Sequence, residues 1–114
     1  MTHMKFDIAA FRKRVAEKQM ARAKKNDAFY DWLAASAYDH IMESLATEDY
    51  RSGMAEFNLD MPYHDLMDDR FRFDGSKSTD AVKQKLTDTG FTDVEVVIRF
   101  DDADLYFYVD YYVQ

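Results

Sequence analysis

The sequence has no cysteine, one proline and three glycines among its 114 residues. Without cysteine, disulfides, thiolate zinc sites and a cysteine nucleophile are excluded. No apolar run approaches the roughly 18 residues that span a bilayer. The first residues also lack the apolar stretch of a signal peptide, because Phe11 is followed at once by Arg12, Lys13 and Arg14. We therefore expect a cytoplasmic protein with no membrane partner.

Motifs that carry chemistry are missing as well. The chain contains no G-x-S-x-G, no H-E-x-x-H, no Walker glycine loop and no dinucleotide fingerprint. Its three histidines are scattered, and the best cation candidates, His64, Asp65, Asp68 and Asp69, are explained as well by a polar helix start. We expect no catalytic residues, no metal and no cofactor, and therefore a protein that is not an enzyme.

Charge is distributed unevenly along the chain. Residues 1–25 carry eight basic and two acidic side chains, a net charge of +6, whereas residues 26–114 carry seven basic and twenty acidic ones, a net charge of −13. Aspartate supplies 17 of the 22 acidic residues and favours caps and turns, so much of this charge should lie on rigid parts of the fold. A basic arm (residues 1–26) and an acidic body (residues 27–114) of a single domain are predicted. The two parts either pair with each other within the chain, dimerise head to tail, or bind two different kinds of partner.

Two helices are predicted in the first 46 residues, over 7–25 and 28–46. Asp7 is the expected N-cap, and Met4, Ile8, Phe11 and Val15 form one apolar seam at 4-3-4 spacing. In the second helix an apolar residue recurs at every fourth position from Phe29 to Leu45. Asn26-Asp27 is interpreted as a break, since helices much longer than 25 residues are unusual in a small domain. One helix over 7–46 is the alternative.

The remaining segments alternate between strand and helix patterns. Apolar and polar residues alternate over 53–61, Pro62 favours a short helix over 63–69, and 70–73 is a further strand candidate. A helix over 80–89, capped by Ser78 or Thr79, ends at Gly90, with Phe91 as its hydrophobic contact. Strands over 93–101 and 104–113 form a C-terminal hairpin around an Asp-rich turn. These elements predict an α+β fold in which two N-terminal helices pack beside an antiparallel sheet of three or four strands.

The last strand has two different faces. Leu105, Phe107, Val109, Tyr111 and Val113 alternate with Tyr106, Tyr108, Asp110 and Tyr112. Tyrosine supplies rigid amphipathic area, so the second set is predicted to bind a partner protein, with Asp101, Asp102 and Asp104 as a negative rim. Cross-strand packing under a helix is the alternative for these tyrosines. Trp32 lies off the apolar face of its helix, and either packs under the first helix or serves as a further partner anchor.

The expected function is that of an acidic protein-interaction module whose partner has a basic surface. Carboxylates spaced like phosphates would occupy a nucleic-acid groove of that partner, as a DNA mimic does. In size and composition the chain is similar to small inhibitory proteins of phages and mobile elements. This likeness covers no aligned motif.

Two alternatives stay open. Arg14, Lys18, Arg22 and Lys25 form a basic stripe along one helix, which phosphates of DNA or RNA could follow. The basic arm could instead cross to the acidic body of a second copy and form a homodimer. Exposed ion pairs contribute only about 0–1 kcal/mol each, so such a dimer also needs apolar contact from Phe11, Met20 or Trp32.

Overall fold

The computed structural model describes residues 5–48 and 51–114. It consists of a long helix α1 (Ile8–Glu48), strand β1 (Ser52–Asn58), a short 3-10 helix η1 (Met61–Leu66), helix α2 (Ser76–Thr89) and strands β2 (Val94–Asp101) and β3 (Tyr106–Val113). The strands form an antiparallel sheet in the order β1-β3-β2, with β2 and β3 as the C-terminal hairpin. The predicted α+β class is thereby confirmed.

The prediction of two separate N-terminal helices is wrong. Helix α1 runs through Asn26 and Asp27 without interruption and is 41 residues long. Asn and Asp lower helix propensity by less than about 1 kcal/mol each, which is too little to end a helix whose next turns are buried. Phe29, Leu33, Ala37 and Ile41 are fully buried and hold the helix just after this point. Asp7 is the N-cap as expected, and its Oδ1 accepts a 3.1 Å hydrogen bond from the Ala10 N–H.

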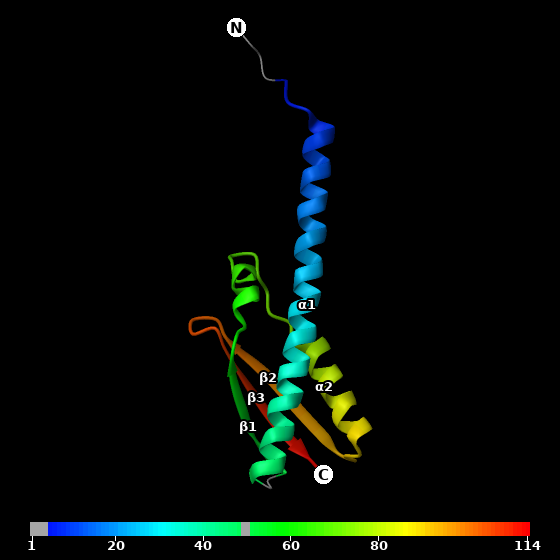
Figure 1. Cartoon of the computed structure of the whole chain (residues 1–114), viewed down its shortest axis with the longest axis vertical. Helices are drawn as coiled ribbons and strands as arrows, with labels where there is room; N and C mark the ends of the chain where they lie inside the picture. The colour runs from blue at the N-terminus through cyan, green and yellow to red at the C-terminus, as the bar shows by residue number, and fades with distance from the viewer. Residues whose placement is uncertain (1–4, 49–50) are drawn as a thin grey trace.

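Only the second half of α1 packs on the sheet, and this shapes the molecule. Figure 1 shows α1 lying across the sheet beside α2 and then continuing well beyond the rest of the chain towards its N-terminus. The Cα atoms extend over 75 × 28 × 17 Å, and their radius of gyration is 19.3 Å. A compact chain of this length has a radius of gyration of about 13 Å. The difference arises from the projecting segment, residues 8–21, in which every residue is exposed except the half-buried Val15.

The core lies between the helices and one face of the sheet. Helix α2 contributes Val82 and Leu86, and alternate residues of the three strands face both helices. The buried apolar residues are Phe29, Leu33, Ala34, Ala37, Ile41, Ala55, Phe57, Leu59, Leu66, Val82, Leu86, Val96, Ile98, Phe107, Val109, Tyr111 and Val113. The face of the sheet that the helices cover is therefore the one that the alternation in the strands predicts.

Several local boundaries differ from the predictions. The short helix is a 3-10 turn that begins at Met61, and residues 70–73 form no strand. Helix α2 starts at Ser76, four residues early, with Gly75 at its N-cap position and no side-chain cap. Ser78 does not cap the helix, since it is buried and its Oγ donates a 2.7 Å hydrogen bond to the Tyr30 carbonyl of α1.

The expected end of α2 is confirmed. Gly90 has φ 122°, and its N–H bonds to the carbonyls of Leu86 and Thr87. The N–H of Phe91 donates to the Leu86 carbonyl, and its ring packs against the core.

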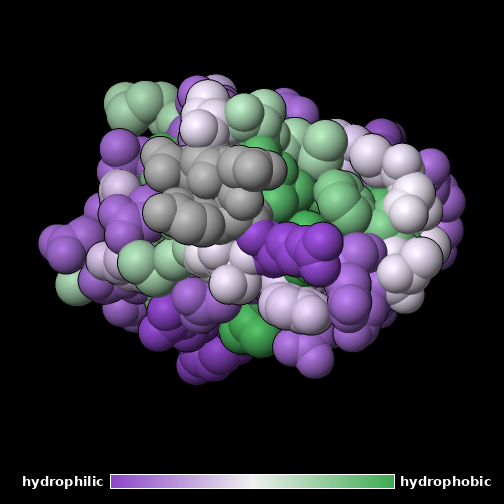
Figure 2. Space-filling view, turned by 90° about the horizontal axis from the view of Figure 1, so that it is seen from below, coloured by the Kyte–Doolittle hydropathy of each residue, from purple (hydrophilic) through white to green (hydrophobic). Residues whose placement is uncertain are grey.

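Seen from the end opposite the projecting segment, the surface mixes hydrophobic and hydrophilic residues (Figure 2). Within the described residues, no helix is long and apolar enough to cross a membrane.

Candidate interaction surfaces

The face of the sheet turned away from the helices is uncovered. We call it the open face; β3 lies in its middle, with β1 and β2 on either side. Burial alternates strictly along β3, from half-buried Tyr106 to buried Val113. The open face consists of Ser52, Met54, Glu56, Asn58, Glu95, Val97, Arg99, Asp101, Tyr106, Tyr108, Asp110 and Tyr112. The structure thus brings the predicted tyrosines and Asp110 to one surface, which no helix of the described residues covers.

Strand register places residues of different chemistry side by side across the open face. Tyr108 lies between Glu56 and Arg99, and Asp110 lies between Met54 and Val97. Met54 on β1 and Val97 on β2 are apolar side chains that are 47% and 55% exposed. Four carboxylates and one guanidinium give the open face a net charge of −3. The surface is therefore amphipathic and acidic, as interfaces with basic partners are.

Contacts within the open face fix its tyrosines. The rings of Tyr106 and Tyr108 meet edge to face at 5.3 Å, and the Arg99 guanidinium lies 5.7 Å from the centre of the Tyr108 ring. Arg99 also forms a 3.0 Å ion pair with Asp110. The Tyr106 hydroxyl donates a 3.3 Å hydrogen bond to Glu56. Partial desolvation, followed by the negative charge of Glu56, raises the pKa of Tyr106, so its hydroxyl stays protonated and can donate.

The Asp-rich turn has two roles rather than one. Asp101 stabilises the turn, because its Oδ1 accepts hydrogen bonds from the N–H groups of Ala103 at 3.1 Å and Asp104 at 3.4 Å. Leu105 has φ 52° and completes the reversal into β3. Asp102 and Asp104 are exposed. Of the three predicted rim residues, these two are the ones with carboxylates turned to solvent.

A hollow that the sequence pattern did not indicate lies between this turn and the loop after η1. Its volume is about 550 Å³, and its lining includes the apolar Phe71, Phe100 and Leu105 together with the acidic Asp69 and Asp102. The Leu59 N–H, just before η1, donates to the Leu105 carbonyl of the turn at 2.8 Å. Residues 64–72 and 100–105 are far apart in sequence, so only the tertiary structure brings them to one place.

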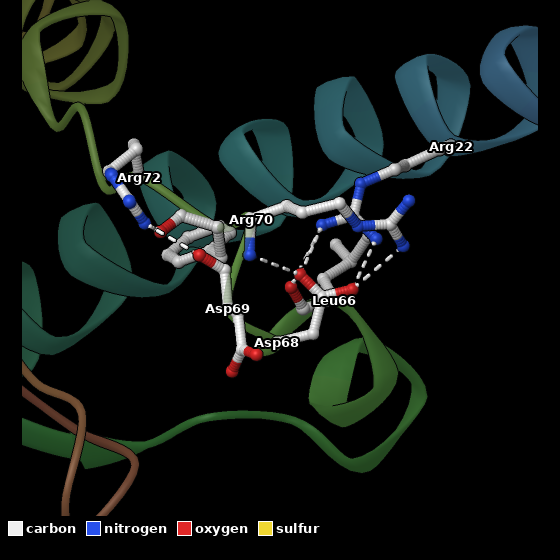
Figure 3. A network of polar contacts seen from close by, with 7 residues as sticks. Arg22, Leu66, Asp68, Asp69, Arg70 and Arg72 are labelled. Atoms are coloured by element: carbon white, nitrogen blue, oxygen red, sulfur yellow. Dashed lines mark hydrogen bonds and ion pairs between the residues drawn. The ribbon is translucent and has the colours of Figure 1, made fainter.

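The predicted basic stripe is divided by the fold. Arg22 donates two 3.0 Å hydrogen bonds to the carboxylate of Asp68 and a third, of 3.3 Å, to the Leu66 carbonyl. Arg70 binds the same carboxylate at 2.9 Å (Figure 3). Lys25 pairs with Asp65 at 2.6 Å. Two of the four stripe residues are therefore engaged by the body.

These ion pairs lower the pKa of two acids, one within η1 and one just after it. Hydrogen bonds from Arg70 and then from Arg22 hold the pKa of Asp68 well below its usual range, and the bond from Lys25 lowers the pKa of Asp65. The remaining stripe residues, Arg14 and Lys18, are exposed on the projecting segment. Asp65 and Asp68, two of the candidate cation ligands, thus bind basic side chains of α1.

The projecting segment also exposes its apolar seam. Ile8 is 54% and Phe11 45% exposed, and Phe6 packs its ring against Phe11 at 5.3 Å. The fourth predicted seam residue, Met4, lies outside the described residues. Large apolar side chains that line up on a solvated helix are typical of a surface that another molecule covers.

Trp32 belongs to the edge of the core. Its ring is half-buried and packs against Phe57, Tyr63 and Phe107 at 5.7–5.9 Å. The expected packing under a separate first helix is wrong, because Trp32 lies on the same continuous helix. It is also remote from the open face, since Phe57 and Phe107 point to the helix-covered side of the sheet.

The histidines are engaged in local contacts. His64 Nε2 lies 3.1 Å from the Leu59 carbonyl, and His40 Nδ1 lies 2.7 Å from the Ser36 carbonyl while its ring stacks on Phe57. In the part of the chain that the structure describes, no three His, Asp or Glu side chains gather as a metal site.

Comparisons with protein families, curated proteins and solved structures found no match to this chain.

Proposed function

We propose that this protein is a non-enzymatic interaction module that binds a basic protein surface with the open face of its sheet. One observation carries the proposal: three tyrosines, two exposed apolar residues and four carboxylates lie on one face of the sheet, and no helix in the described part of the chain covers it. Tyrosine anchors and a charged surround are the features that protein interfaces favour.

The contacts among the open-face residues support this proposal. Arg99 is held by Asp110 and Tyr108, so it neutralises only one of the four carboxylates. Within the described chain, no ion pair involves Glu56 or Glu95. Their charges remain available to a basic partner, which they attract and orient.

Photo-crosslinking tests the proposal directly. A benzophenone side chain placed at Tyr108 or Tyr112 should crosslink to a protein, either in a cell extract or in the purified sample. The same group at Tyr38, a half-buried tyrosine on the helix side, is the matched control. Glu56→Lys with Glu95→Lys should reduce the crosslink, and so should Asp102→Lys with Asp104→Lys if the rim contributes. Equal crosslinking at Tyr108 and Tyr38 would contradict the proposal.

A competition assay tests whether the open face inhibits a nucleic-acid-binding partner by occupying its basic surface. A partner that normally binds DNA or RNA through its basic surface would lose that ligand when the open face occupies it. Adding the protein to such a complex should release the nucleic acid, and the Glu56→Lys, Glu95→Lys variant should release less. A partner that keeps its nucleic acid at saturation uses some other surface.

A further inference from the structure

The apolar seam of the projecting segment lies on the same side of α1 as the core residues. Phe11 and Phe29 are 18 residues apart, as are Val15 and Leu33, and 18 residues make five full helical turns. Phe29 and Leu33 are buried against the sheet. Phe11 and Val15 therefore face the direction in which the sheet lies, but about 27 Å further along the helix axis.

The helix cannot cover the open face of its own chain. Helix α1 is continuous to Glu48 and packs on the opposite face of the sheet, and its basic residues at the exit from the body are already paired with Asp65 and Asp68. Figure 3 shows Arg22 at Asp68 beside this exit, and Figure 1 shows the helix continuing past it, away from the sheet. Among the described residues, the body leaves Ile8 and Phe11 exposed, so the seam is open to another molecule.

The charge around the seam indicates what kind of molecule covers it. The seam is flanked by Arg12 and Lys18, and residues 8–21 carry four basic and one acidic side chain, a net charge of +3. Two projecting segments placed side by side would bring like charges together. Nucleic acid would neutralise the charge but leave Ile8 and Phe11 exposed to water. The best complement is an acidic surface with apolar and aromatic groups.

We propose that the projecting segment of one chain lies on the open face of a second copy, and that the exchange is reciprocal. The open face has a net charge of −3 and presents Met54, Val97 and the β3 tyrosines to the seam. A two-fold axis that is perpendicular to α1 and lies in the plane of the sheets brings each sheet between its own helix and the partner's helix. This inference rests on the proposed function, because it names the basic surface that the open face binds.

The arrangement explains two exposed surfaces with one contact. Ile8 and Phe11 are covered by the partner's sheet, while Met54 and Val97 are covered by the partner's helix. The apolar contact is needed, since exposed ion pairs alone contribute little. By symmetry the contact occurs twice, which doubles the buried area and closes the assembly at two chains.

Charge reversal gives a test with matched controls. Arg12→Glu with Lys18→Glu reverses the charge beside the seam, and Lys13→Glu with Lys24→Glu makes the same change on the opposite side of the helix. Glu56→Lys with Glu95→Lys reverses the open face, and Asp31→Lys with Asp39→Lys is its control on the exposed side of α1. Sedimentation equilibrium at low salt should show a wild-type dimer that weakens as salt is added. The two interface variants should dimerise at least tenfold more weakly, and the controls should match the wild type.

Mixing the two interface variants completes the test. In a heterodimer of the two variants, the acidic segment of the Arg12→Glu, Lys18→Glu chain lies on the basic open face of the Glu56→Lys, Glu95→Lys chain. The second contact joins the unchanged basic segment of the latter to the unchanged acidic open face of the former. An equimolar mixture should therefore form heterodimers although each variant alone is monomeric. A monomeric wild type, controls that dissociate equally, or a mixture that stays monomeric would each overturn the inference. If no dimer forms but a benzophenone at position 108 still crosslinks to a different protein in extract, the dimer inference is wrong and the proposed function stands. If position 108 crosslinks to nothing, the dimer inference and the proposed function are both wrong.

Discussion

The guanidinium of Arg22 holds the carboxylate of Asp68 with two hydrogen bonds of 3.0 Å, at the point where α1 leaves the body. The two residues are 46 positions apart, and the pair fastens the loop after η1 to the helix. Arg22 and Asp68 are only about one-third exposed, so solvent screens this pair less than the fully exposed charges of the projecting segment.

Acid should weaken the fold through the carboxylate of Asp68, which is bound by Arg70 and by Arg22. These hydrogen bonds, those of Arg70 first, hold the folded-state pKa of Asp68 below its unfolded value of about 3.8, so they stabilise the protein fully above that pH. As the pH falls below about 4, the unfolded chain takes up the proton first, and the stability from these contacts is lost progressively towards the folded pKa. Asp68→Asn should flatten the acid side of the stability–pH curve from urea unfolding. Asp102→Asn, an exposed acid without these partners, is the control, and an equal effect of both changes would contradict the assignment.

The continuity of α1 can be tested at Asn26. Proline in a helix interior removes a backbone hydrogen bond and costs about 3 kcal/mol or more, so Asn26→Pro should lower the free energy of unfolding and the helical circular dichroism. Asn26→Ala should instead stabilise the protein by a few tenths of a kcal/mol, because alanine has the higher helix propensity. A break between two helices would tolerate proline and gain nothing from alanine.

The buried hydroxyl of Ser78 should contribute to the packing of α2 on α1. Its hydrogen bond to the Tyr30 carbonyl lies between the helices, and Ser78→Ala is expected to cost about 1 kcal/mol. Thr87 donates a similar 2.8 Å bond to the Lys83 carbonyl, but at an exposed position of α2. Thr87→Ala should therefore cost much less in the same urea titration. Equal losses would mean that burial adds nothing to the Ser78 contact.

Gly90 should be sensitive to substitution for backbone reasons alone. A Cβ at this position would meet no atom within 4 Å, but φ is 122°, which side chains of L-residues rarely adopt. Gly90→Ala is expected to lower the free energy of unfolding by about 1 kcal/mol or more. Lys83→Ala, on the exposed side of the same helix, provides the comparison in thermal unfolding. A Gly90 variant as stable as the Lys83 variant would show that the strain is relieved by local movement.

Local patterns were sufficient for most of the secondary structure. The alternation in β2 and β3 identified the hairpin and its buried face, because a strand with one covered face must repeat every second residue. Asp7 and Gly90 were correct as helix ends, since their side-chain and backbone properties act over only a few residues. Asn26-Asp27 misled the prediction because its weak local preference was overruled by the burial of Phe29 and Leu33 in the following turns.

The sequence by itself determined the α+β class, the separation of charge and the tyrosine-bearing face of β3, all of which follow from the order of residues along one element. Only the tertiary structure decided that helices cover one face of the sheet and leave the tyrosines open. It also engaged Arg22 and Lys25 with the body and left the first turns of α1 projecting. These outcomes depend on which distant segments meet, because the free energy of packing and ion pairing is shared between elements that no local pattern connects.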